Sequence, residues 1–217
     1  MNHKLMKLGA IVLSTLMCQP VSAQEQPADN ETKIIASYGQ LTQTFTYSGV
    51  SVDVTVDGYS IGGTFPVTDV IGIQAAYTAG NGSLLGFGYD LTQTYFGLEY
   101  NLNNDLRLSE GTGSKLSASL GVASGKISTT ISGATYSESD SFTMVGLSTE
   151  IATSKNMSVL GSLSADINDF NPTYGLGVNI GVGGNSYVQL SYSGSTDKIG
   201  AIDVDTSLIS IGYQTRF

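Results

Sequence analysis

The chain has 217 residues, of which only 12% are charged, with 18 acidic residues against nine basic ones. This acidic balance argues against nucleic acid as a partner, because phosphate binding relies on Lys and Arg. Glycine is abundant at 27 residues, and the 12 tyrosines, 7 phenylalanines and many β-branched residues exclude a disordered chain. The composition suits an all-β protein that has an apolar outside and a small, polar inside.

The first 23 residues have the features of a secretory signal peptide. Lys4 and Lys7 give a positive start, and the apolar run Leu8–Met17 is too short to cross a bilayer as a helix. Small residues at Val21-Ser22-Ala23 form a cleavage site, so we expect cleavage after Ala23.

Removal of this segment limits the chemistry of the mature chain, because His3 and Cys18 are the only residues of their kinds. Lipidation of Cys18 is a weaker alternative, since the residue before it is Met17 rather than a small residue. Without His or Cys, the usual acid–base group, thiol nucleophiles and disulfides are all excluded. We therefore expect no enzymatic activity, no cofactor and no metal site.

After a polar, acidic arm at residues 24–33, the chain breaks into alternating segments separated by turn residues. No helical period stands out, and we expect one domain over residues 34–217. Strands are predicted within residues 34–47, 58–65, 71–78, 95–102, 115–122, 144–151, 158–167, 174–183, 187–193 and 205–217. We expect a loop or hairpin extension at 48–57, long loops at 79–90, 103–113, 126–140 and 195–203, and short turns at 66–69, 154–156 and 184–185.

The two faces of these segments differ consistently. One face is apolar or aromatic, and the other is mostly Gly, Ser, Thr, Gln and Asn. In a soluble sandwich the second face would meet water and should be rich in Lys and Glu. Apolar-out, polar-in alternation over about ten residues is typical of barrels in lipid. The pattern predicts a closed antiparallel transmembrane β-barrel of about ten strands, with eight as an alternative.

The final strand ends the chain on an aromatic residue. Phe217, Tyr213, Ile211 and Ile209 share one face, with Thr215 as the only polar member. This ending resembles the C-terminal assembly signal of bacterial outer-membrane barrels, which implies recognition by the barrel-assembly machinery. The alternative is an ordinary closing strand of a soluble β protein.

Two further stretches, Gly58–Asp69 (GYSIGGTFPVTD) and Tyr174–Gly177 (YGLG), look like strand-and-turn segments of a known family. With the signal peptide and terminal Phe, the chain resembles the OmpA/OmpX-like outer-membrane β-barrel domains of Gram-negative bacteria. The resemblance implies an outer-membrane location, with the lipid bilayer and lipopolysaccharide as surroundings. It says little about activity.

Glu99, Lys115 and Glu150 fall on the predicted inner face of three neighbouring strands. Lys115 is therefore expected between two carboxylates. The cluster could form a constriction or gate. It could instead be a set of charges that neutralise one another inside a filled barrel, which we favour because buried charges must be paired.

These observations predict an integral outer-membrane barrel that is structural or forms a narrow passive pore. An adhesin-like surface protein that binds through extracellular loops is the alternative. A soluble exported barrel that binds a ligand is a third possibility.

Overall fold

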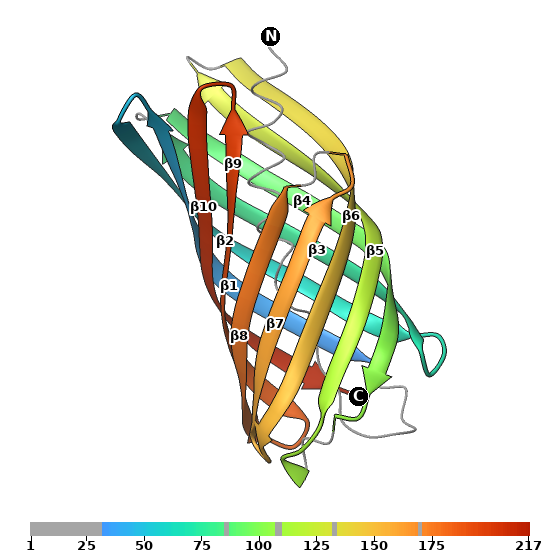
Figure 1. Ribbon diagram of the computed structural model, residues 1–217. Coiled ribbons are helices and arrows are strands. Elements are labelled where there is room, and N and C mark those ends of the chain that lie inside the picture. Colours follow the sequence, from blue (N-terminus) through green and yellow to red (C-terminus); the bar gives the residue numbers. More distant parts are fainter. Residues whose placement is uncertain (1–31, 85–86, 107–109, 132–133, 169–170) are drawn as a thin grey trace.

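The computed structural model describes residues 32–84, 87–106, 110–131, 134–168 and 171–217. Ten antiparallel β-strands within these ranges close into one barrel, in which each strand pairs with the next and β1 pairs with β10 (Figure 1). The all-β barrel prediction is confirmed, and the eight-strand alternative is wrong. The strands are β1 (Lys33–Tyr47), β2 (Val50–Pro66), β3 (Ile71–Leu84), β4 (Phe87–Asn104), β5 (Ser114–Ile131), β6 (Ala134–Ser154), β7 (Met157–Asp166), β8 (Pro172–Gly183), β9 (Ser186–Ile199) and β10 (Ile202–Arg216).

The expected signal peptide and residues 24–31 of the expected arm lie outside the described residues. The first strand, β1, begins at Lys33. In the described ranges, no helix combines the length and the apolar content needed to cross a bilayer.

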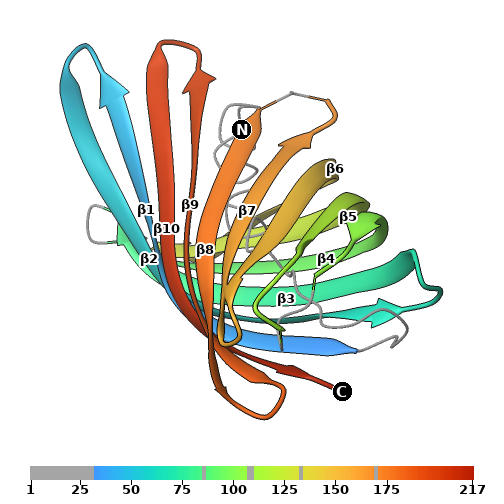
Figure 2. The ribbon, with the colours of Figure 1, turned by 60° about the horizontal axis from the view of Figure 1, so that its bottom comes forward.

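The first and last strands join at the seam of the barrel. Their register runs from Lys33 opposite Arg216 to Thr46 opposite Asp203. Next to the Lys33–Arg216 pair, Thr32 and Phe217 exchange two backbone hydrogen bonds of 3.1 and 2.9 Å. The start of β1 and the end of β10 therefore lie at one end of the barrel, here called the termini end, and the opposite end is called the far end (Figure 2).

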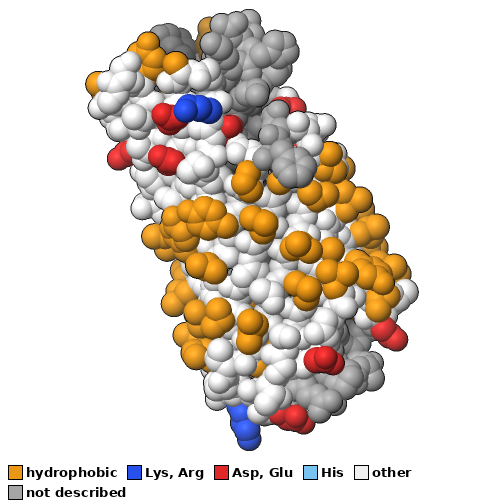
Figure 3. All heavy atoms as spheres, viewed as in Figure 1, with side chains coloured by type: hydrophobic (Ala, Val, Ile, Leu, Met, Phe, Trp, Pro, Cys, Tyr) orange, Lys and Arg blue, Asp and Glu red, His pale blue; other side chains and the backbone are white. Residues whose placement is uncertain are grey.

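The outside of the barrel carries an apolar band. Hydrophobic side chains cover the middle of the molecule, while polar and charged ones gather toward its ends (Figure 3). Leu98, Leu120, Leu147 and Ile211 in this band are each at least half exposed. Aromatic side chains mark both edges of the band. The exposed ones are Tyr38, Tyr59, Tyr77, Tyr174 and Tyr192 at the far edge and Phe65, Tyr100 and Phe217 at the termini edge.

Three segments expected as long loops are instead mostly strand. Residues 79–84, 126–131, 134–140 and 195–199 extend existing strands toward the far end, so paired hairpins rise there (Figure 1). The physical reason is a change of alternation. Along β2, Tyr59 and Ile61 point outward, whereas the buried Val54 and Val56 nearer the far end point inward. Beyond the band the outer face meets water, so the apolar-out pattern that identifies a membrane strand ends there.

Inward apolar side chains pack into one group, here called the lumen cluster. Its members come from six strands and are nearly inaccessible to solvent: Leu41, Val56, Leu91, Ala123, Phe142, Met144 and Leu208. Tyr95 packs against the cluster and lies over Gly121, where a Cβ atom would come within 2.6 Å of its ring. The small wall residue thus makes room for a large lumen side chain.

The apolar band can be tested on one face of one strand. We expect Leu98→Arg to lower the free energy of unfolding in lipid by about 2–4 kcal/mol, because it places a charge in hydrocarbon. The matched Thr92→Arg variant lies on the same face of β4, beyond the band, and should change the free energy by less than about 1 kcal/mol. Reversible urea unfolding from vesicles measures both. Equal losses of unfolding free energy in the two variants would contradict the position of the band.

Candidate functional site

Five charged side chains point into the lumen near the termini end and form the charge ring: Lys33, Glu99, Lys115, Glu150 and Arg216. They come from β1, β4, β5, β6 and β10, and each is at most 3% exposed. Lys115 pairs with Glu99, Arg216 lies 3.9 Å from Glu150, and Lys33 is directly opposite Arg216 in the register. The ring is therefore a single electrostatic unit that spans the barrel.

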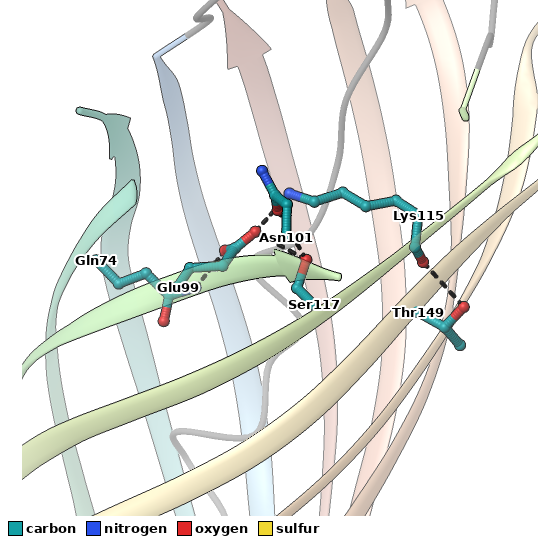
Figure 4. A network of polar contacts seen from close by, with 6 residues as sticks. All are labelled: Gln74, Glu99, Asn101, Lys115, Ser117 and Thr149. Atoms are coloured by element: carbon teal, nitrogen blue, oxygen red, sulfur yellow. Dashed lines mark hydrogen bonds and ion pairs between the residues drawn. The ribbon is translucent and has the colours of Figure 1, made fainter. Parts of the chain in front are cut away.

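Glu99 is the best-satisfied member of the ring. Its Oε1 accepts from Lys115 Nζ and from Ser117 Oγ (3.1 Å), and its Oε2 accepts from Gln74 Nε2 (2.6 Å), as Figure 4 shows. β3, β4 and β5 supply these groups. The inward face of each strand thus brings its polar side chains to one point.

Glu150 has different partners. Its Oε1 accepts from Ser158 Oγ and from Asn179 Nδ2 (3.1 Å), and Arg216 Nη2 lies 3.9 Å away. Lys115 lies directly opposite Glu150 in the β5–β6 register, but its ion pair in the described structure is with Glu99. The structure thus places all three predicted residues in the lumen and joins Lys115 to one carboxylate rather than two.

The sequence analysis missed two ring members. Lys33 was assigned to the arm, although its spacing from the inward residues Ile35 and Ser37 continues the alternation of β1. Alternation puts Arg216 on the face opposite Phe217 but does not indicate a partner. In the structure its guanidinium lies 4.3 Å from the ring centre of Tyr187, a stacked cation–π contact. That contact depends on the pairing of β9 with β10, which the sequence does not state.

The connection between β4 and β5 folds against the same end of the barrel. Leu106 is 1% exposed and packs with Tyr187 and Ala152. Gly113, with a φ of 92°, lies in this connection, and its carbonyl accepts a hydrogen bond from Ala152 N. Leu106 therefore packs against the same tyrosine, Tyr187, over whose ring the Arg216 guanidinium lies.

The predicted assembly-signal residues all face outward. Ile209, Ile211, Tyr213 and Phe217 are between 52% and 69% exposed and belong to the apolar band. Within the described residues, no group of His, Cys, Asp or Glu side chains is arranged to hold a metal ion.

No family model and no curated protein sequence matches the chain. Among solved structures, the outer membrane protease OmpT from Escherichia coli is similar, with a TM-score of 0.53 at 12% identity over 91% of this chain and 100% of that one. The translocator domain of the autotransporter NalP from Neisseria meningitidis aligns at a TM-score of 0.49 and 10% identity, over 98% and 96% of the two chains. The outer membrane protein OprG from Pseudomonas aeruginosa aligns at 0.42 and 10%, over 89% and 99%.

The similarity to OmpT concerns the fold. The apolar exterior and the closed ten-stranded sheet define the class of this protein as a small transmembrane β-barrel, with the same fold as that outer-membrane protein.

The Glu99–Lys115 pair makes a direct prediction. Lys115→Met leaves the buried Glu99 carboxylate without its cation, and we expect the free energy of unfolding to fall by about 3–5 kcal/mol. The double variant Glu99→Gln/Lys115→Met removes both charges and should recover most of that loss. Urea unfolding in vesicles at constant pH compares the two. A double variant no more stable than the single one would show that the pair is not the source of the effect.

Proposed function

We propose that this outer-membrane barrel is a filled membrane anchor that presents its far-end hairpins at the cell surface for interaction with other molecules. The lumen cluster is the observation that carries the proposal. Its side chains come from β10, β1 and β2 on one wall and from β4, β5 and β6 on the other, and they pack together inside the barrel. An open pore needs a continuous polar path, and this packing argues against one.

The charge ring occupies the same lumen as the lumen cluster, nearer the termini end, and it supports the same conclusion. All five of its residues are buried, and its two carboxylates are bound by Lys115 and by neighbouring Ser, Asn and Gln side chains. The ring therefore acts as structural filling of the polar half of the lumen. A narrow passive pore gated by Lys115 is the less favoured function.

The shape of the far end supports the surface role. Short turns at the termini end and longer elements at the other are typical of these barrels, and this asymmetry orients the far end toward the exterior. β6 has 21 residues but β7 only ten, and pairing between them stops at Met144. In the described structure, residues 134–142 have a strand partner on the β5 side alone (Figure 1). Such an unpaired edge can add a strand from another chain.

We further propose that the exposed face of β10 that ends in Phe217 is recognised by the barrel-assembly machinery, and that the protein is not an enzyme. The first statement rests on the outward apolar residues Ile209, Ile211, Tyr213 and Phe217. The second rests on the sequence, whose single His lies at position 3, within the predicted signal peptide.

Conductance separates the filled anchor from the pore. We expect the purified barrel in planar bilayers to give no unitary current steps, and Lys115→Ala to give none either while lowering the unfolding midpoint. Steps from the native protein that change in size or frequency in Lys115→Ala would instead establish a gated pore.

The surface role is tested by shortening the longest hairpin. Replacing residues 128–137 with Asn-Gly joins the paired residues Ile127 and Glu138 through a two-residue turn. We expect adherence of bacteria displaying this variant to cultured animal cells to fall to the level of cells without the protein. The matched control replaces residues 198–203 with Asn-Gly, between the paired Asp197 and Val204, and keeps the β6 edge. Undiminished adherence of the first variant, or none by the native protein, would refute the surface role.

A further inference from the structure

The charge ring is not electrically balanced. It holds three buried cations, Lys33, Lys115 and Arg216, against two buried carboxylates, Glu99 and Glu150. Charges shielded from water need a counter-charge nearby. The ring is thus one negative charge short.

The imbalance is concentrated at Lys33. Its two cross-strand neighbours are Arg216 on β10 and Thr64 on β2. Like charges directly opposite each other on a sheet repel. Lys115 is paired with Glu99, and Arg216 contacts Tyr187 and lies near Glu150, whereas Lys33 Nζ has no hydrogen-bond partner in the part of the chain that the structure describes.

Several donors are free around this position. Among the described residues, Lys33 Nζ, Thr64 Oγ1 and the three guanidinium nitrogens of Arg216 are buried and have no hydrogen-bond partner. Four of these five atoms belong to cations and can only donate, while the Thr64 hydroxyl can donate as well. The missing partner for such a group is an acceptor that carries negative charge.

A small pocket at the termini end reaches two of these residues, Lys33 and Thr64. Lys33, Thr64, Asn101 and Lys115 line it, together with two carboxylates, Glu99 and Asp69. Glu99 is already bound by three side chains, as Figure 4 shows for its network. Asp69 lies on the exposed turn between β2 and β3, where water screens its charge. Neither carboxylate contacts Lys33 as an ion pair in the described structure.

We propose that this pocket binds a small monovalent anion between Lys33 Nζ and the Thr64 hydroxyl. The anion supplies the missing negative charge beside Lys33, on the β2 side, away from Arg216. It enters from the termini end, so binding needs no passage through the lumen cluster. The inference stands independently of the proposed surface role.

Anion-linked stability of the purified full barrel in detergent tests this site, because a ligand that binds only the folded state raises stability with its concentration. Sodium bromide is titrated against sodium gluconate at constant ionic strength, and the urea midpoint is measured. We expect a saturable rise in bromide. In Lys33→Met the apparent bromide affinity should fall by at least about tenfold, as expected when a charge-assisted hydrogen bond is lost. Lys155→Met, an exposed lysine on a turn at the same end, is the matched control and should respond like the native protein.

Anomalous diffraction from crystals of the native protein grown in bromide gives a second measurement that does not require the variant to fold. We expect a peak within contact distance of Lys33 Nζ and Thr64 Oγ1. Only water in the pocket, a midpoint that does not depend on bromide, or an equal bromide response in Lys33→Met would overturn the proposal.

Discussion

The structure depends on which medium each face of a strand meets. In hydrocarbon no water is available for backbone hydrogen bonds, so the sheet must close on itself, and ten strands do so with β1 pairing to β10. The outer face within the band must then be apolar. Beyond the band the outer face meets water, and the apolar side chains move to the inner face, as Tyr59 outward and Val56 inward show on β2. The reversal of alternation marks the edge of the membrane in the sequence itself.

The same constraint explains how much of the fold could be predicted. Strands within the band were identified, with their faces, because lipid on one side and a polar lumen on the other give a clear period of two. The far-end extensions were taken for loops, because segments such as 126–140 alternate in the opposite sense and are rich in Ser and Thr. The apolar-out, polar-in alternation identifies strand segments in the membrane, and it does not identify the parts of the same strands that extend beyond it.

The charge ring shows what one-dimensional spacing can supply and what it cannot. Glu99, Lys115 and Glu150 could be assigned to one face from alternation alone. Their partners could not be, because Arg216 reaches Glu150 only through closure of the barrel, which brings β10 near β6 across the lumen. Lys33 continues the alternation of β1, but its position beside the acidic arm does not reveal a partner. Its role becomes visible only when the register sets it opposite Arg216.

The start of β1 and the end of β10 pair at the termini end, where the inner face carries charges and the outer face belongs to the apolar band. Arg216 turns into the lumen and reaches the ring, while its neighbour Phe217 turns outward at the edge of the apolar band. A shift of β10 by one residue would expose Arg216 to lipid and bury Phe217 among charges, because the side-chain period is two. The same shift would remove Arg216 from its position opposite Lys33. The ring and the band therefore fix the register of the closing seam from opposite sides, and the buried charges specify how the barrel closes as well as filling its lumen.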